Sequence, residues 1–244
     1  MLIRDIGLIL SCKKFSENLV LIKIFSQKNG FVSGLYRPKS KKKKFNLEKV
    51  HFEWRAKSRD KLGFFKIEVD YDNFDFQEDY FSSLMKASMC ELSILFLADN
   101  EVNQEIYSSM NDLLIFLERN KLESISIKCQ KYIFWEICLL KNIGYGLDLE
   151  KCALSGKKDG LKYISPKSGR AVNFIYAEPY KEKLFFLPAF FINEKENILK
   201  NDLINGLNII NHFFHKAIED LNIRKEKVLI FRKEIFKKIE SFGQ

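Results

Sequence analysis

The sequence predicts an α+β protein in which a small five-stranded barrel is followed by an α-helical domain that carries a small inserted subdomain. In residues 1–70, apolar and polar side chains alternate in short runs, as they do in half-buried strands. From residue 80 onwards, apolar side chains recur at three- and four-residue steps, which is typical of amphipathic helices. The two parts also differ in charge, because residues 1–70 carry a net charge of +10 and residues 71–244 a net charge of −1.

Five strands are expected in the first part, where turn residues such as Asn29-Gly30 and Arg59-Asp60 separate the alternating runs. Such a set without an amphipathic helix suits a small closed barrel, and the oligonucleotide-binding (OB) fold is the common five-stranded case. We therefore predict an OB-fold domain over residues 1–72. The expected strands are Asp5 to Ser11, Asn18 to Ser26, Gly30 to Arg37, Leu47 to Lys57 and Leu62 to Asp70.

An acidic, turn-rich stretch ends the barrel region, and the period then changes. Residues 73–79 are predicted to be a linker and residues 80–244 a helical domain. The third helix should stop at Gly144 and Gly146, because glycine favours helix ends. Apolar stripes predict helices over residues 84–95, 106–117, 124–142, 203–221 and 228–239.

The segment 144–192 fits neither period and is rich in Gly, Pro and Ser. It is too long for a bare connection inside a compact domain. We expect an irregular small subdomain, or short hairpins packed on the helices.

The surplus positive charge is concentrated in one loop of the predicted barrel. Five of the six residues from Lys39 to Lys44 are lysine, and Arg37 precedes them. A compact basic segment creates a local field that attracts a polyanion, and each lysine that neutralises a phosphate makes affinity salt-dependent. Nucleic acid is therefore the leading candidate partner. The predicted phosphate-binding residues are Arg37, Lys39, Lys41, Lys42, Lys43 and Lys44, and the patch is extended by Lys13, Lys14, Arg55, Lys57 and Arg59.

Barrels that bind single strands also use exposed aromatic rings on which bases stack. Of the aromatic residues in the predicted strands, Tyr36 and Trp54 are the best candidates, because rings with a polar tip tolerate exposure. The alternative for each is a place in the barrel core.

Nothing in the sequence supports an enzyme. There is no P-loop and no dinucleotide fingerprint, and His212 and His215 lack a partner carboxylate at ligand spacing. The five cysteines are odd in number and include no C-x-x-C pair. No apolar run is long enough to span a bilayer, and Arg4 and Asp5 lie too near the first apolar run for a secretory signal. We expect a cytoplasmic protein without catalytic residues, cofactor or membrane contact.

Two anchors resemble the RecO family of bacterial recombination-repair proteins. One reads Gly144-Tyr145-Gly146-Leu147, then Cys152 and Ser155-Gly156, then Tyr163-Ile164-Ser165-Pro166 and Gly169. The other is Gly7 to Ser11, Glu17-Asn18 and Gly30 to Arg37 before the basic loop. The resemblance spans nearly the whole chain.

This resemblance implies an OB barrel joined to a helical domain, and a nucleoid-associated role in DNA recombination and in the response to DNA damage. It implies a mediator that binds single- and double-stranded DNA, anneals complementary strands, and helps RecR to load recombinase onto strands coated by single-strand-binding protein. It also implies a groove for the acidic C-terminal tail of single-strand-binding protein on the helix before the Gly-Tyr motif. The candidate groove residues here are Lys128, Lys131 and Trp135.

The chain departs from the metal-binding members of that family, which place four cysteines around the small subdomain. Here Cys152 stands alone, with Ser155 and Asn173 near the other expected positions. Tetrahedral zinc needs four ligands, so we expect a zinc-finger-like subdomain without metal. Two alternatives remain: an OB-fold RNA-binding protein associated with ribosomes or transfer RNA, and a metal-dependent hydrolase around Cys152.

Overall fold

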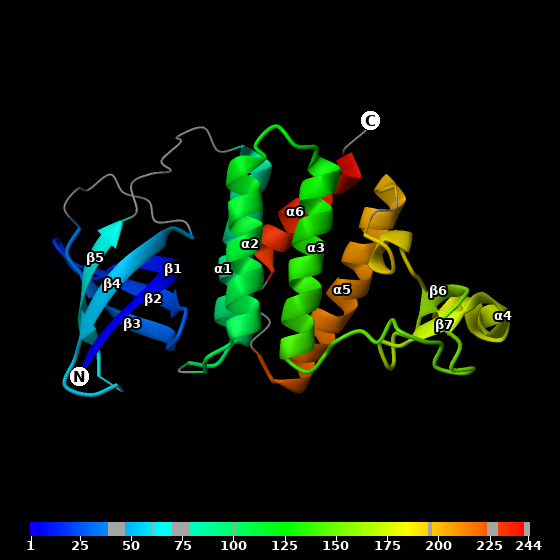
Figure 1. Cartoon of the computed structure of the whole chain (residues 1–244), viewed down its shortest axis with the longest axis horizontal. Coiled ribbons are helices and arrows are strands. Elements are labelled where there is room, and N and C mark those ends of the chain that lie inside the picture. The colour runs from blue at the N-terminus through cyan, green and yellow to red at the C-terminus, as the bar shows by residue number, and fades with distance from the viewer. Residues whose placement is uncertain are drawn as a thin grey trace. The chain divides into compact units, whose positions relative to one another are not determined.

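The computed structural model describes residues 1–38, 47–59, 61–69, 79–99, 101–194, 197–223 and 229–241 (Figure 1). The chain forms two compact units, Met1–Leu114 and Ile115–Gln244. A closed five-stranded barrel lies at the N-terminus and helices follow it, so the predicted fold class is confirmed. The predicted linker falls outside the described residues except for Asp79, and the predicted domain boundaries stay a prediction.

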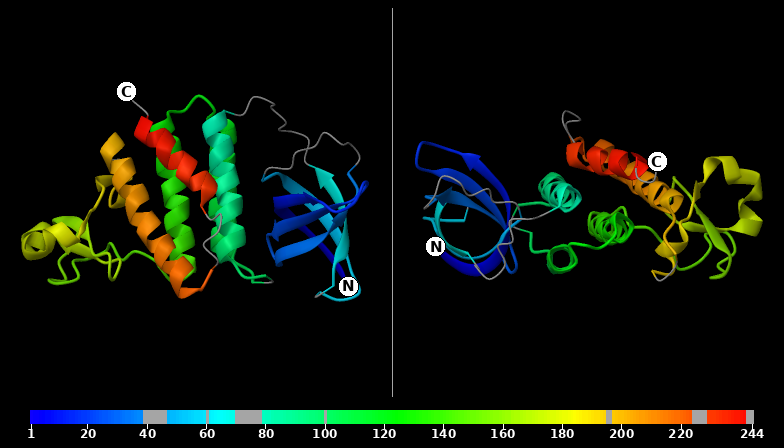
Figure 2. Two further views of the ribbon diagram at one scale, coloured as in Figure 1. Left: turned by 180° about the vertical axis from the view of Figure 1, so that it is seen from behind. Right: turned by 90° about the horizontal axis from the view of Figure 1, so that it is seen from above.

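The barrel is a single sheet that closes on itself in the order β1-β2-β3-β5-β4, as the view from above in Figure 2 shows. All pairings are antiparallel except the short parallel seam between β3 and β5. The first strand pairs with β4 through its first half and with β2 through its second, and an irregularity between Ile9 and Ser11 bends it for this purpose. The strands are β1 Leu2–Lys14, β2 Val20–Ser26, β3 Gly30–Tyr36, β4 Lys49–Arg55 and β5 Gly63–Val69.

Trp54 fills the barrel where β3 meets β5. Its indole is buried, and Nε1 donates a hydrogen bond to the Ser33 carbonyl at 3.0 Å. Glycine is required beside it, because a Cβ on Gly63 would lie 2.4 Å from the indole and one on Gly34 would lie 2.9 Å from it. The remaining core comes from alternate positions of all five strands, as the period of two predicts: Ile3, Ile9, Ile22, Ile24, Val32, Val50, Phe52, Phe65 and Ile67.

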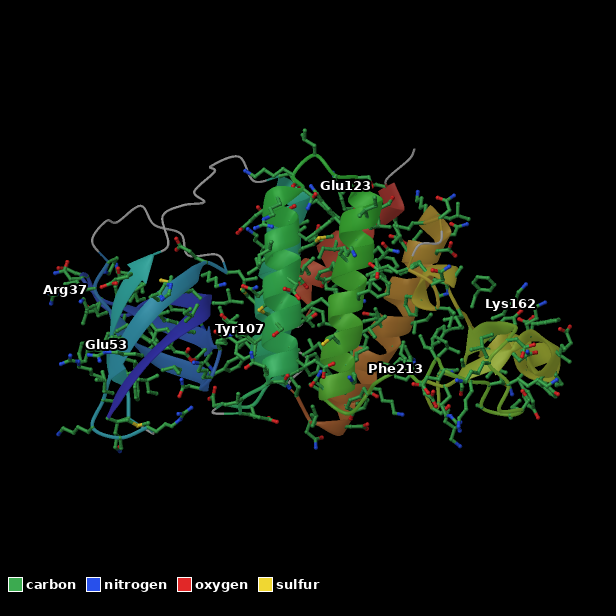
Figure 3. All side chains as sticks on the ribbon, in the orientation of Figure 1. Arg37, Glu53, Tyr107, Glu123, Lys162 and Phe213 are labelled. Carbon is green, nitrogen blue, oxygen red and sulfur yellow. The ribbon has the colours of Figure 1, made fainter. Side chains whose placement is uncertain are left out.

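Helix α1 and the part of α2 up to Leu114 complete the first unit. Helix α1, Tyr80–Phe96, begins at Asp79, whose carboxylate accepts from the Ser82 backbone N–H at 2.9 Å. Helix α2, Gln104–Arg119, places Tyr107 edge-on to Phe25 of β2, with ring centroids 5.5 Å apart (Figure 3). The polar contact between Lys49 Nζ and Asn111 Oδ1 also ties the barrel to α2.

The second unit is built on three long helices: α3 Ile125–Asn142, α5 Lys200–Asp220 and α6 Ile230–Ser241. Helix α5 packs against both α3 and α6 (Figure 2). The predicted helices agree with these positions, since each apolar stripe lies within or close to an observed helix.

A buried ion pair joins the three helices. Arg232 of α6 binds Glu136 of α3 through Nε at 2.7 Å and Nη2 at 3.2 Å, and the two side chains are only 3% and 0% exposed. The guanidinium also donates to Asn211 Oδ1 and to the Leu207 carbonyl of α5. Nearly all its hydrogen-bonding capacity is therefore met inside the protein, as a buried charge requires.

A small subdomain lies between α3 and α5, as the irregular composition predicts. Its sheet has the order β7-β6-β8, and α5 packs against β8 and the following turn. The elements are β6 Leu161–Ile164, β7 Ala171–Asn173, α4 Phe174–Ala177, the 3₁₀ turns η2 Glu178–Lys183 and η3 Ala189–Phe191, and β8 Phe185–Phe186.

Candidate nucleic-acid interface

One end of the barrel gathers three of the predicted phosphate-binding residues. Lys14 pairs with Val20, which pairs with Tyr36, so the register sets Lys13 and Lys14 at the same end of the barrel as Arg37, with β2 between them. All three cations are exposed, and Arg37 lies at the periphery of the barrel in Figure 3. Lys39, Lys41, Lys42, Lys43 and Lys44 lie outside the described residues, and their role stays a prediction.

The other predicted cations follow the end of β4. Arg55 pairs in register with Leu2 and Phe64, and Lys57 is exposed beyond it. Arg59 is half-buried, and its guanidinium donates to the Asn29 carbonyl in the β2–β3 turn. This contact gives Arg59 a role in holding that turn.

The outer face of β1, β4 and β5 carries a cation that the sequence analysis missed. Glu53 lies between two guanidinium groups, with Arg4 Nε 2.7 Å from Oε2 and Arg55 Nη2 2.7 Å from Oε1. The hydrogen bond from Arg4 lowers the pKa of Glu53, and Arg55 lowers it further. Both arginine side chains remain 69% exposed, so the trio presents a net positive charge to solvent.

The signal that could have identified Arg4 is the period of two along β1. Positions 2, 4 and 6 form one face of that strand, opposite the buried Ile3. The predicted strand began at Asp5, whereas β1 begins at Leu2, so Arg4 lay outside the prediction.

The structure does not place either predicted stacking residue fully on the barrel surface. Trp54 is 2% exposed and its ring has no face on which a base could stack, which corrects the expectation. Tyr36 is half-buried and packs against the barrel core. Phe64, which was not considered, is 58% exposed and pairs in register with Arg55. Alternation places Trp54 and its partner Phe65 inside the barrel, and Arg55 and its partner Phe64 outside.

A shallow cavity of about 550 Å³ crosses the same outer face, but its charge is balanced. It contains three cations, Arg4, Lys28 and Lys66, and the three carboxylates of Asp5, Glu53 and Glu68. A cavity with equal numbers of opposite charges attracts a polyanion weakly as a whole, so a phosphate contact on this face depends on the exposed guanidinium groups of Arg4 and Arg55. The remaining lining residues are Ile6, Gln27, His51 and Phe52.

Asp5, which lines that cavity, has a structural role in the barrel. Its carboxylate accepts from the Ser26 hydroxyl, the Lys28 and Ile6 backbone N–H groups and the Asn29 amide. Burial acts to raise the pKa of Asp5, but these hydrogen bonds outweigh it and the pKa is lowered. The charged carboxylate therefore fixes the β2–β3 turn against β1.

The three residues predicted for a partner-tail groove do not form one. Lys128 is buried and donates from Nζ to the Lys121 carbonyl at 2.6 Å, and Trp135 is buried beside Tyr132. Lys131 is partly exposed but pairs with Glu194. This corrects the expectation, and the reason is that α3 is buried on more than one face.

Cys152 is held by hydrogen bonds where the related metal-binding pattern has a ligand. Its Sγ accepts from the Asn173 backbone N–H at 3.3 Å, and it packs against Val172 and Ala177. Burial acts to raise the pKa of the thiol, but hydrogen bonds from Ser155, Asn173 and Leu154 outweigh it and lower the pKa to about 7.

Asn173 extends this arrangement, since its Nδ2 donates to the Asp159 carbonyl at 2.7 Å and its Oδ1 caps α4. Within the described residues, no three His, Cys, Asp or Glu side chains gather at a potential metal site. The described helices also include none that is long and apolar enough to cross a membrane.

Comparisons with known proteins cover most of the chain. The family model described as "Recombination protein O C terminal" matches residues 77–226. Over 222 residues the chain is 34% identical to the DNA repair protein RecO of Rickettsia canadensis, with 88% of this chain and 89% of that protein covered. It is 33% identical to the RecO of Rickettsia typhi over 224 residues, covering 88% and 91%. With the RecO of Rickettsia felis it is 31% identical over 240 residues, covering 96% and 98%.

Proposed function

Because the chain belongs to the RecO family of DNA repair proteins, we propose that it is a non-enzymatic mediator that binds single- and double-stranded DNA and anneals complementary strands. The observation that carries this proposal is the exposed basic surface of a closed OB-type barrel. Lys13, Lys14 and Arg37 lie together at the end where the chain enters the lysine-rich segment 39–44.

The mechanism is charge neutralisation. Two DNA strands repel each other through their phosphates, and cations that bind those phosphates release counterions and lower the repulsion. A surface that contacts phosphates positions a strand without selecting its sequence. Any complementary pair can then meet on the barrel, and no bond needs to be made or broken by the protein.

The partner roles of the family belong to the same proposal. The protein would assist recombinase loading together with RecR on strands coated by single-strand-binding protein. The side chains of Lys128 and Trp135 are buried, so the acidic tail of single-strand-binding protein would have to bind at another surface.

The test is strand annealing as a function of salt. Annealing of two complementary oligonucleotides should be fast at low salt and should fall steeply as salt is added. A Lys13→Ala, Lys14→Ala, Arg37→Ala variant should anneal more slowly and bind either strand more weakly. The matched control replaces Lys233, Lys237 and Lys238 of α6 by alanine, which removes the same number of positive charges from the second unit.

Annealing that is unaffected in the barrel variant, or reduced equally in the α6 variant, would contradict the proposal. Competition between single-stranded DNA and RNA of one sequence separates it from the RNA-binding alternative. A protein that recognises the ribose 2′-hydroxyl would bind the RNA more tightly than the DNA.

A further inference from the structure

We propose that a pocket between β8 and α5 receives a single unpaired base of a bound strand, which gives the second unit a nucleic-acid contact of its own. The inference rests on the proposed function, because it assumes that the ligand is nucleic acid. The cavity has a volume of about 360 Å³. Its lining consists of Phe185, Phe186, Asn205, Asn208, Asn211, His212 and His215.

The lining matches the chemistry of a base. Proteins that bind unpaired bases stack them on aromatic rings and bond their polar edges. Here β8 supplies two phenyl rings, and α5 supplies three carboxamides, each of which carries both donors and an acceptor. Asn205, Asn208, His212 and His215 follow one another at three- and four-residue steps, so they share one face of α5.

The absence of formal charge among these seven residues decides between ligand classes. No Lys, Arg, Asp or Glu lines the cavity. A carboxylate of an acidic peptide would enter it without a counterion, and burying an unpaired charge is costly. A base is planar and neutral, and its strand keeps the phosphates outside.

Lys216 is the candidate contact for a phosphate of the strand. It follows His212 by one turn of α5 and stands next to the lining residue His215, and its Nζ donates to the Lys167 carbonyl at 3.2 Å. The turn η2, which leads directly into β8, is neutral overall, because it carries Glu178 and Glu182 besides Lys181 and Lys183. A neutral lining with a cation beside it suits a base and its backbone.

Two walls of the pocket are fixed before any ligand arrives. His212 Nε2 lies 3.0 Å from the Pro166 carbonyl, and because a carbonyl only accepts, this nitrogen carries the hydrogen. The same imidazole meets the Phe185 ring edge-on at 5.3 Å. Asn211 Oδ1 accepts from the buried Arg232 at 3.0 Å. Fixed walls lower the ordering cost of binding.

Phe186 is the best residue to test, because it is 47% exposed and lines the cavity. Its ring also meets Tyr163 edge-on at 6.1 Å, so the stability of the variant must be measured as well. Phe174 is the matched control. It is an equally exposed phenylalanine of the same subdomain, but it lies outside the cavity lining, with Lys162 Nζ 5.8 Å from its ring centroid. Figure 3 labels Lys162 on β6, the strand that pairs with β8, and Phe213 on α5, the helix that packs against β8.

The experiment is photocrosslinking of the full chain to a single-stranded oligonucleotide that carries 5-iodo-2′-deoxyuridine. We expect a crosslinked peptide that contains Phe185, Phe186, His212 or His215. Phe186→Ala should lose this crosslink and bind the strand about fivefold or more weakly, the loss expected for one stacked base. Phe174→Ala should match the wild-type protein, and thermal unfolding should show that both variants fold.

The outcomes separate this inference from the function on which it rests. Crosslinks confined to the barrel, with equal affinity in Phe186→Ala, would overturn the pocket and leave DNA binding intact. A glutamate-rich peptide that displaces the pocket crosslink, while a strand with an abasic site binds as well as the intact one, would assign the pocket to a protein partner. Failure of the wild-type chain to bind any strand would overturn both proposals.

Discussion

The two compact units use arginine in opposite ways. In the first unit, Arg4 and Arg55 share Glu53 at the surface and remain largely exposed. In the second, Arg232 of α6 and Glu136 of α3 are buried, and the guanidinium also donates to Asn211 and Leu207 of α5. An exposed ion pair is worth about 0–1 kcal/mol, whereas breaking a buried one costs about 3–5 kcal/mol.

This difference shows why the number of charges alone does not identify a candidate binding residue. The helical unit has many charged residues too, but its most strongly bound arginine holds α6 to α3 and α5. The barrel has its cations on the outside, where a phosphate can replace water. Position relative to the core, and not the number of charges, separates a binding residue from a structural one.

The largest effect should come from breaking the buried pair. Arg232→Ala leaves Glu136 charged without a partner, and we expect the free energy of unfolding to fall by about 3–5 kcal/mol. Urea denaturation monitored by circular dichroism measures this change. The double variant Glu136→Leu, Arg232→Met should recover much of the loss, because both charges are then removed. A cost below 1 kcal/mol for Arg232→Ala would break the comparison between the units.

Crowding at the barrel seam should have the next largest effect. Gly63→Ala places a Cβ where the Trp54 indole lies, and overpacking of this kind costs about 1–3 kcal/mol. Thermal unfolding measures the change. Adding Trp54→Phe, whose ring is smaller, should restore part of the stability. An unchanged unfolding temperature in Gly63→Ala would show that the Trp54 indole does not pack tightly against Gly63.

Phe64 tests whether the outer face of the barrel contacts bases as well as phosphates. Phe64→Ala should weaken binding of a single strand by about 1–3 kcal/mol, the range for one stacked base, with stability nearly unchanged because the ring is exposed. Fluorescence anisotropy with a labelled oligonucleotide gives the affinity. Duplex binding is the internal control, since paired bases cannot stack on the ring. An equal loss for both ligands would indicate damage to the barrel and not a lost stack.

The last prediction concerns the thiol of Cys152 in the second unit, which is buried and accepts a hydrogen bond from the Asn173 backbone N–H. The folded state lowers the pKa of the thiol from 9.0 to about 7, so the contribution of the thiolate to stability is present above pH 9 and is lost as the pH falls through 7. The free energy of unfolding should therefore rise between pH 7 and 9. In Cys152→Ala that rise should disappear. An identical pH profile in the variant would remove this role from Cys152.

Alternation and helical period were sufficient to predict the barrel and the long helices, because each strand and helix buries a regular face. The small subdomain could be located but not described in detail, since its hydrogen bonds around Cys152 and Asn173 join residues about twenty apart. Lys128 and Trp135 were expected in a groove because of the resemblance to the family, which the helical period alone could not test. Tertiary packing of α3 buries both side chains.

Arg4, Phe64 and the pocket on α5 were missed for a related reason. Each depends on which side of an element faces solvent, and a one-residue shift in a strand reverses that assignment. The pocket also depends on β8, a two-residue strand that the sequence pattern does not show.

The most direct test of the central claim is the salt dependence of single-strand binding in Arg4→Ala, Arg55→Ala, compared with wild type. If exposed arginines of the barrel bind phosphates, the slope of log K against log salt should become shallower by about 0.7 for each lost contact, while stability changes by less than about 1 kcal/mol. Glu53→Gln should move affinity in the opposite direction, because it removes the negative charge between the two guanidinium groups. An unchanged slope in the double variant would contradict the account of the barrel surface.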